Sequence, residues 1–177
     1  MLEDKIRILI VEARFYDDLA DEMLKAAADV ITAHGAEYDV VSVPGALEIP
    51  GEIASAEEGG QGPAGKRYDG YVALGCVIRG ETYHFEIVSD QSAAGIMALG
   101  IRGVIIGNGV LTVEDEDQAW ARARLSEGDK GGGAAREQLL ARLGIKGQVF
   151  QRHGVGQWGY TRFSTMAAVY RELLNDR

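Results

Sequence analysis

The stretch that most constrains the fold is an uninterrupted apolar run at residues 71–78, which reads YVALGCVI and is followed at once by a polar turn. A short apolar run of this kind is typical of a β-strand buried on both faces. After the turn at residues 79–82, apolar residues recur at helical spacing, at Phe85, Val88, Ile96 and Leu99. A strand buried on both faces needs a helical layer on each side, so this segment predicts an α/β fold.

The rest of the chain repeats the alternation of strand and helix. We expect strands at residues 6–11, 38–43 and 71–78, and a fourth that begins at 104–106 and ends in Gly107-Asn108-Gly109-Val110-Leu111-Thr112. Predicted helices begin at the capping residues Asp17 or Asp18, Thr82 and Thr112, and a further helix covers residues 134–143. This pattern predicts a three-layer α/β/α fold with a four-stranded, mainly parallel sheet in flavodoxin-like order.

Composition limits the class of protein. The net charge of −9 and the isoelectric point near 4.8 argue against a general nucleic-acid binder and against attraction to anionic membranes. The first residues do not form a signal peptide, and no segment reaches the roughly 20 apolar residues of a membrane helix. A single cysteine, Cys76, suits a reducing cytoplasm. We expect one domain at residues 1–143 and a C-terminal extension of unknown role at 144–177.

The carboxyl ends of the predicted strands carry polar and aromatic residues. Right-handed crossovers bring these ends to one edge of a parallel sheet, where ligands of open α/β folds bind. That edge would hold Phe15, the turn at residues 46–48, the turn at residues 80–84 and Asn108. The sequence therefore predicts a ligand site at the carboxyl edge of the sheet.

Each of these residues has a functional and an ordinary interpretation. Thr82 can cap a helix whose free N–H groups bind phosphate, and the helix dipole disfavours a charged His84, which leaves a neutral imidazole able to accept a proton. The ordinary alternative is a capped helix with a solvated histidine. Phe15 can stack on a planar ligand or only cover the sheet end. Glu48 can accept hydrogen bonds from a ligand, and Arg122 can bind an anion, or both can be solvated helix residues.

Taken together, these segments resemble the lumazine synthases of riboflavin biosynthesis. The matching pieces lie in the same order and spacing over about residues 5–140, and they are Arg14-Phe15, Pro44-Gly45-Ala46-Leu47-Glu48-Ile49-Pro50, Leu74-Gly75-Cys76-Val77-Ile78-Arg79-Gly80-Glu81-Thr82, His84-Phe85, Gly109-Val110-Leu111-Thr112, Gln118-Ala119 with Arg122, and Lys130-Gly131. Any one piece is weak, whereas all of them in register are specific.

The resemblance implies a reaction and a set of residues for the first substrate. The family condenses 5-amino-6-(D-ribitylamino)uracil with 3,4-dihydroxy-2-butanone 4-phosphate and releases 6,7-dimethyl-8-ribityllumazine, phosphate and water. No metal or organic cofactor takes part. By resemblance, Phe15 stacks on the pyrimidine, and the uracil and ribityl groups are held by Ala46, Leu47, Glu48, Cys76, Val77 and Ile78.

The resemblance also assigns the second substrate and the assembly. Glu81 and Thr82 would bind the butanone phosphate, His84 would transfer protons, Arg122 would pair with the phosphate from a neighbouring subunit, and Lys130 would shape that region. The family forms homopentamers or larger assemblies, including cages, with active sites at subunit interfaces. Riboflavin synthase is a candidate protein partner.

The sequence departs from the family pattern at three places. Tyr16 stands where many relatives have Asn, and Asn108 stands where many have a Phe that covers the pyrimidine, so Asn108 would contribute an amide hydrogen bond instead. Residues 144–177 replace the usual end of the last helix, and His153 in that segment is a poor metal ligand by itself. Two alternatives stay open at this point: a non-catalytic flavin or lumazine binder of the same fold, and a shell-forming protein.

Overall fold

The computed structural model describes residues 6–59 and 67–143, with side chains described as far as Arg136. Strands and helices alternate along the described chain, and a further helix ends it. Their bounds are β1 (Arg7–Ala13), α1 (Asp17–Ala33), β2 (Glu37–Val43), α2 (Ile49–Gly59), β3 (Gly70–Ile78), α3 (His84–Ile101), β4 (Ile106–Val113), α4 (Glu116–Ala123) and α5 (Lys130–Leu143). Within those two ranges no helix is both long and apolar enough to cross a bilayer.

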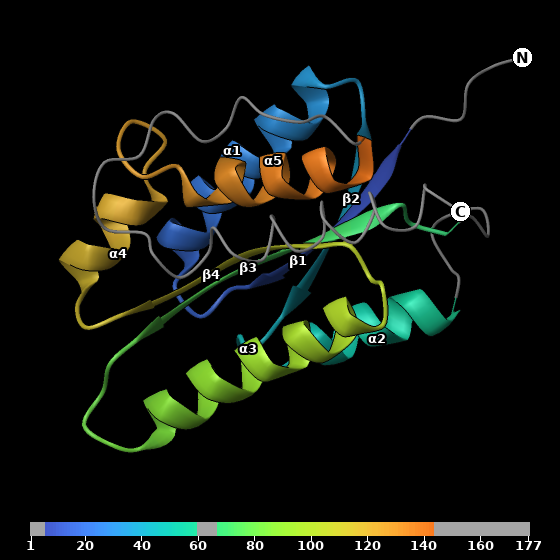
Figure 1. Ribbon diagram of the computed structural model, residues 1–177. Helices are drawn as coiled ribbons and strands as arrows, with labels where there is room; N and C mark the ends of the chain where they lie inside the picture. The colour runs from blue at the N-terminus through green and yellow to red at the C-terminus, as the bar shows by residue number, and fades with distance from the viewer. Residues whose placement is uncertain (1–5, 60–66, 144–177) are drawn as a thin grey trace, which may run out of the picture.

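The four strands form one parallel sheet in the order β2-β1-β3-β4 (Figure 1). The predicted flavodoxin-like α/β/α fold is confirmed. β3 lies between β1 and β4, and all its residues except Ile78 are buried, as the apolar run predicts. β2 is an edge strand and alternates between exposed and half-buried residues. Because every strand is parallel, all four carboxyl ends point to the same edge of the sheet.

Helices cover both faces of the sheet (Figure 1). On one face α1, α4 and α5 pack against the sheet around Ile8, Ile10, Val72 and Leu74. On the other face α2 and α3 enclose a second core, centred on Leu9, Val11, Tyr71 and Ala73, whose side chains alternate with those of the first core along β1 and β3. The strand alternation therefore divides the apolar residues between two helical layers.

The predicted caps were wrong at three helices. α1 begins after Tyr16, and α3 begins after Tyr83, in each case without a side-chain capping bond, so neither Asp17, Asp18 nor Thr82 caps a helix. α4 is capped by Asp115, whose carboxylate accepts a bond from the Gln118 N–H at 2.8 Å. Capping residues were sought from local sequence alone, whereas the strand pairing sets where each helix can begin. α1 ends just before Gly35, whose left-handed φ of 72° suits a glycine that follows a helix.

The fourth strand was predicted at nearly the observed residues, but Asn108 was wrongly placed at its carboxyl end. β4 continues to Val113, and Asn108 is its third residue, paired with Ala73 in the middle of the sheet. Gly109 follows Asn108 within the strand and does not form a turn. It allows β4 to pack closely, because a Cβ at Gly109 would lie 2.7 Å from the Ala73 carbonyl oxygen. Asn108 therefore does not lie at the carboxyl edge.

The division into a domain at 1–143 and an extension at 144–177 stays a prediction. Residues 144–177, including His153, lie outside the described residues.

We predict that Gly131→Ala destabilises the protein by about 1–3 kcal/mol, because a Cβ at this position in α5 would overlap the carbonyl oxygen of Met23 in α1. Gly133→Ala in the same helix is the matched control: its Cβ would meet no atom within 4 Å. That change should leave stability unchanged or raise it by up to about 1 kcal/mol. Chemical denaturation of both variants measures the difference, and equal stabilities would contradict the close packing of α1 and α5.

Candidate active site at the carboxyl edge of the sheet

Three of the predicted site segments meet beside Gly75. A Cβ built at Gly75 would lie 3.3 Å from Ala13 at the end of β1, 3.4 Å from Ile49 at the start of α2, and 3.6 Å from Ala46 in the turn before it. The end of β1, the β2–α2 turn and the end of β3 therefore converge at one place. A side chain at Gly75 would crowd Ala13 and would touch Ile49 and Ala46, so the glycine lets these segments approach closely.

The end of β3 leaves part of its backbone open to a ligand. The ladder between β1 and β3 ends at the pair Glu12 and Leu74, whereas the ladder between β3 and β4 continues to Ile78 and Val113. Residues 75–78 therefore extend past the end of β1. They pair with β4 on one side and, among the described residues, have no neighbouring strand on the other. Backbone N–H and C=O groups at such a position are suited to bind a polar ring.

Phe15 and the β2–α2 turn each follow a strand whose carboxyl end lies at this edge of the sheet. Phe15 follows β1 and is 72% exposed, and its ring contacts Tyr16 edge-on at 5.0 Å between centroids. In the β2–α2 turn Ala46 is buried, whereas Leu47 and Glu48 are exposed. An exposed aromatic ring and a carboxylate beside unpaired strand backbone can bind a flat molecule with N–H groups.

The turn between β3 and α3 presents Glu81, Thr82 and His84 to solvent. His84 is the first residue of α3, and the first intrahelical bond runs from the Ile87 N–H to the Tyr83 carbonyl at 3.2 Å. The N–H groups at the start of α3 therefore have no backbone carbonyl acceptor within the helix, which favours an anion there.

Arg79 holds this turn in place. Its guanidinium donates to Glu86 in α3 and to Glu114 after β4, at 2.6 Å in the second case. It also lies over the Phe85 ring, 4.1 Å from the centroid. The hydrogen bond from Arg79 lowers the pKa of Glu86 below its ordinary value. Arg79 is thus occupied by two carboxylates, and it links the start of α3 to the end of β4.

Arg122 and Lys130 lie on the other side of the sheet from α3. Arg122 is exposed in the last turn of α4, and its guanidinium donates to the Gln118 carbonyl at 2.8 Å. Among the described residues no carboxylate pairs with the Arg122 side chain. Lys130 begins α5 and is half-buried. α4 packs on the face of the sheet opposite α3. Within one chain, Arg122 and His84 therefore belong to opposite helical layers.

The side chains of Cys76, Val77 and Asn108 have little or no access to the opening. Cys76 packs with Tyr16, Leu74 and Met23 so closely that no space for a water molecule remains between them. Burial raises the pKa of Cys76 to about 12. Asn108 uses its amide oxygen to accept a bond from the Val110 N–H at 3.0 Å. Cys76, Val77 and Ile78 can therefore serve the site mainly through their backbone.

Two further features of the described residues bear on where a ligand could bind. Within residues 6–59 and 67–143 no group of histidine, cysteine and acidic side chains could hold a metal ion. A depression of about 310 Å³ opens at the opposite edge, where Glu57, Arg67, Tyr68, Tyr71 and Val104 line it, and it contains none of the predicted site residues.

Sequence reasoning missed the groups that hold the site segments in place. Arg14 and Arg79 entered only as parts of matching motifs, and Glu12 was given no role. A carboxylate inside a buried strand, as at Glu12, was the available signal, because such a charge needs a partner.

Comparison with known proteins agrees with the geometry. The family model for 6,7-dimethyl-8-ribityllumazine synthase matches residues 5–142. A 6,7-dimethyl-8-ribityllumazine synthase 1 of Rhizobium meliloti is 60% identical over 135 residues, which cover 76% of this chain and 88% of the relative. Enzymes named 6,7-dimethyl-8-ribityllumazine synthase in Agrobacterium fabrum and Sphingopyxis alaskensis are 57% and 55% identical, over 76% and 80% of this chain and 91% and 95% of their own lengths.

We predict that Cys76 does not react with thiol reagents in the folded protein at about pH 8. The raised pKa keeps the thiol protonated, and the nucleophile in such reactions is the thiolate. The same reagent should modify Cys76 at once in denaturant, which serves as the control because the chain has no other cysteine. Rapid labelling of the native protein would show that the end of β3 is more open than the structure indicates.

Proposed function

Because this chain belongs to the 6,7-dimethyl-8-ribityllumazine synthase family, we propose that its residues perform the family's reaction at the carboxyl edge of the sheet. The enzyme condenses 5-amino-6-(D-ribitylamino)uracil with 3,4-dihydroxy-2-butanone 4-phosphate, the penultimate step of riboflavin biosynthesis. The resemblance seen in the sequence is thereby confirmed. The single observation that carries the site assignment is the convergence of β1, β3 and the β2–α2 turn beside Gly75.

The pyrimidine binds in the opening beside the end of β3. Phe15 stacks on the ring, and the backbone of residues 76–78 exchanges hydrogen bonds with the uracil and ribityl groups. Leu47 and Glu48 close the opening from the β2–α2 turn, with the buried Ala46 shaping it from below. The contact between Asn108 and the pyrimidine stays a prediction. Asn108 pairs with Ala73 in the middle of the sheet, so this contact would lie outside the opening described here.

The butanone phosphate binds at the start of α3. Glu81 and Thr82 lie in the turn, and free N–H groups of the first helical turn favour the phosphate. Arg122 supplies the positive charge, because Arg79 is already occupied by Glu86 and Glu114, whereas Arg122 has no described carboxylate partner. Lys130 shapes the same region.

His84 transfers the protons of the reaction. The amine of the pyrimidine attacks the ketone, water and phosphate leave, and a second ring closes, so protons move at each stage. An exposed imidazole beside the phosphate-binding turn can accept and return them. Phosphate leaves readily when a guanidinium and helix N–H groups hold its charge. Holding the two substrates in contact contributes up to roughly 7–11 kcal/mol in an ideal geometry.

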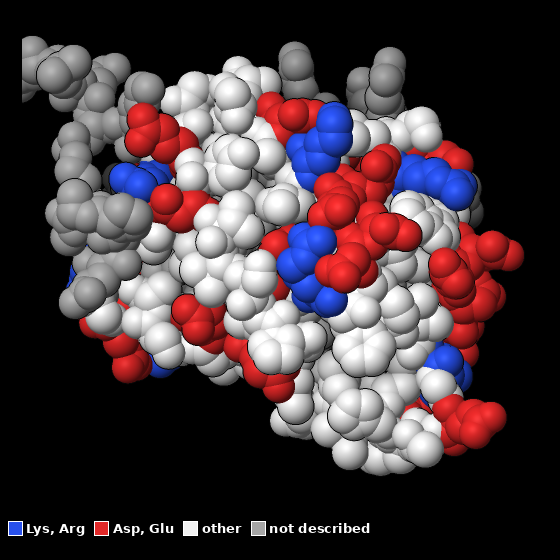
Figure 2. Space-filling model, turned by 180° about the vertical axis from the view of Figure 1, so that it is seen from behind, with Lys and Arg blue, Asp and Glu red and all other residues white. Residues whose placement is uncertain are grey.

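The active site lies between subunits of a homopentamer or a larger shell. Arg122 and the start of α3 belong to opposite layers of one chain, so a neighbouring copy is suited to lend Arg122 to the phosphate. An exposed apolar stripe also follows α3, with Tyr83, Ile87, Met97 and Ile101 on it. On the face shown in Figure 2, uncharged side chains form a continuous area in the lower part, away from the main group of charges. Such areas mark interfaces.

Cage formation is compatible with catalysis. A non-catalytic flavin or lumazine binder of this fold would not need the phosphate-binding residues. We place the enzyme in the cytoplasm because its single thiol suits a reducing compartment. Riboflavin synthase remains a candidate partner, and co-elution with the assembly would test it.

We predict that the purified protein forms fluorescent lumazine from the two substrates and that His84→Ala lowers kcat by about 10²–10⁴-fold. The Kd for the pyrimidine should change little, because His84 lies at the phosphate side of the site. His34→Ala is the matched control, since His34 is exposed after the end of α1, remote from the proposed chemistry. Absence of turnover by the native protein, or full turnover by the His84 variant, would contradict the assignment.

We predict that Arg122→Ala raises KM for the butanone phosphate by roughly 10- to 100-fold, because it removes a charged hydrogen-bond donor from the phosphate. Arg124→Ala is the control two residues along, where the guanidinium pairs with Glu127 at 3.3 Å.

Assemblies refolded from a mixture of Arg122→Ala and His84→Ala subunits should regain activity, since some interfaces then contain both native residues. No recovery in the mixture would place Arg122 and His84 in the same chain's site. Native kinetics in the Arg122 variant would remove Arg122 from the site.

A further inference from the structure

We propose that Arg14 is a positioning residue for the pyrimidine substrate: it fixes the three-residue turn between β1 and α1 so that the Phe15 ring stays in its binding position. This inference rests on the proposed function of Phe15. The turn consists of Arg14, Phe15 and Tyr16, between the end of β1 and the start of α1. Phe15 is its middle residue, so the position of its ring depends on how the two neighbours are held.

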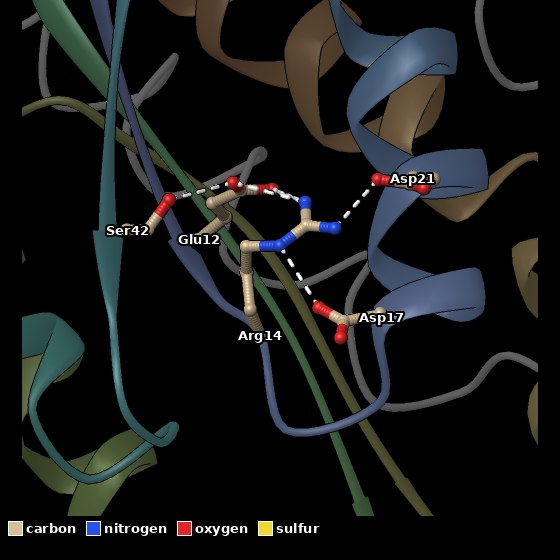
Figure 3. A network of polar contacts seen from close by, with 5 residues as sticks. All are labelled: Glu12, Arg14, Asp17, Asp21 and Ser42. Atoms are coloured by element: carbon tan, nitrogen blue, oxygen red, sulfur yellow. Dashed lines mark hydrogen bonds and ion pairs between the residues drawn. The ribbon is translucent and has the colours of Figure 1, made fainter.

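Arg14 connects three elements, β1 and α1 through its side chain (Figure 3) and β2 through its backbone. Its Nη1 donates to both carboxylate oxygens of Glu12 in β1, at 3.2 and 3.3 Å. Its Nε donates to Asp17 at 3.1 Å, and its Nη2 donates to Asp21 at 2.7 Å, both in α1. Its backbone N–H donates to the Val43 carbonyl at the end of β2, at 3.3 Å. The turn is therefore tied to β1, β2 and α1 at once.

Glu12 anchors the network in the sheet. It is only 3% exposed, and besides Arg14 it accepts a bond from the Ser42 hydroxyl of β2 at 2.8 Å. A buried carboxylate is costly unless it is paired and hydrogen-bonded, so Glu12 strongly favours the arrangement in which Arg14 lies beside it. The bonds to Asp21 and Glu12 also raise the pKa of Arg14 above its ordinary value, so the guanidinium stays charged at any working pH.

Phe15 has little support of its own. It is 72% exposed, and the aromatic contact recorded for its ring is the edge of Tyr16, which is itself part of the turn. Tyr16 is held from the helix side, where its carbonyl accepts the Ala20 N–H at 2.9 Å. If the ring becomes ordered only when the ligand binds, the entropy lost in ordering it weakens the affinity for the ligand. A ring that is already fixed avoids this cost.

The network needs arginine and not merely a positive charge. Three carboxylates lie around a planar group with donors on three nitrogens, and a lysine could contact them only as a single point charge. Arg7 provides a natural comparison, because it joins the same two strands at the opposite edge. Its Nε and Nη2 donate to Asp39 of β2 at 2.8 and 3.1 Å.

Arg14→Lys tests the inference, with Arg7→Lys as the matched control. Lysine keeps the charge beside Glu12 but loses the planar guanidinium with its donors on three nitrogens. We therefore expect the Kd and KM for the pyrimidine to rise by roughly 3- to 10-fold. KM for the butanone phosphate and kcat should change little in the same variant. Arg7→Lys should leave the pyrimidine Kd unchanged. Asp21→Asn removes one exposed contact, and it should shift the same Kd in the same direction by less, in case Arg14→Lys does not fold.

A double-mutant cycle with Phe15→Ala shows whether Arg14 acts through the ring. In the Phe15→Ala background, Arg14→Lys should have no further effect on the pyrimidine Kd. A loss that persists there, an equal loss for both substrates, or the same loss from Arg7→Lys would overturn the inference.

Binding of the pyrimidine is measured apart from turnover, so the two proposals fail separately. If the native protein binds the pyrimidine without forming lumazine, the proposed activity is wrong. The Arg14 inference is then still tested by the double-mutant cycle on the pyrimidine Kd. A native protein that does not bind the pyrimidine would overturn both.

Discussion

The parallel pairing of β3 with β1 and β4 is the constraint on which the rest of the structure depends. β3 is buried on both faces, so helices must cover it from two sides, and right-handed crossovers then direct every strand the same way. All carboxyl ends meet at one edge as a result. The site therefore follows from burial of apolar strands, before any catalytic side chain is considered.

Within that edge, unequal strand lengths create the opening. β3 continues past its last pair with β1 while it still pairs with β4, which leaves backbone groups next to the Phe15 turn. Gly75 lets the neighbouring turn approach, because a Cβ there would crowd Ala13 and touch Ile49 and Ala46. A flat, polar substrate needs an aromatic face and backbone hydrogen bonds, and both are present here without a deep pocket in one chain.

Arginines at this edge have two distinct functions. Arg14 and Arg79 are each surrounded by carboxylates and hold the turns that precede α1 and α3. Arg122 contacts only a backbone carbonyl among the described residues and keeps its charge available. In an acidic protein an anion-binding site needs a local positive charge, and at this edge Arg122 is an arginine without a described carboxylate partner.

The sequence by itself determined the strands, the parallel α/β class and the family, because apolar runs and strand-end motifs are local signals that tertiary contacts reinforce. It did not determine helix starts: Thr82 and Asp17 were credible caps, but strand pairing placed the first turns elsewhere. Nor could it place Asn108, since a glycine pair resembles a turn until packing against Ala73 is known. Only the tertiary structure decided which arginines pair with carboxylates. Their partners lie in other elements, and the distances between those side chains cannot be read from spacing in the sequence.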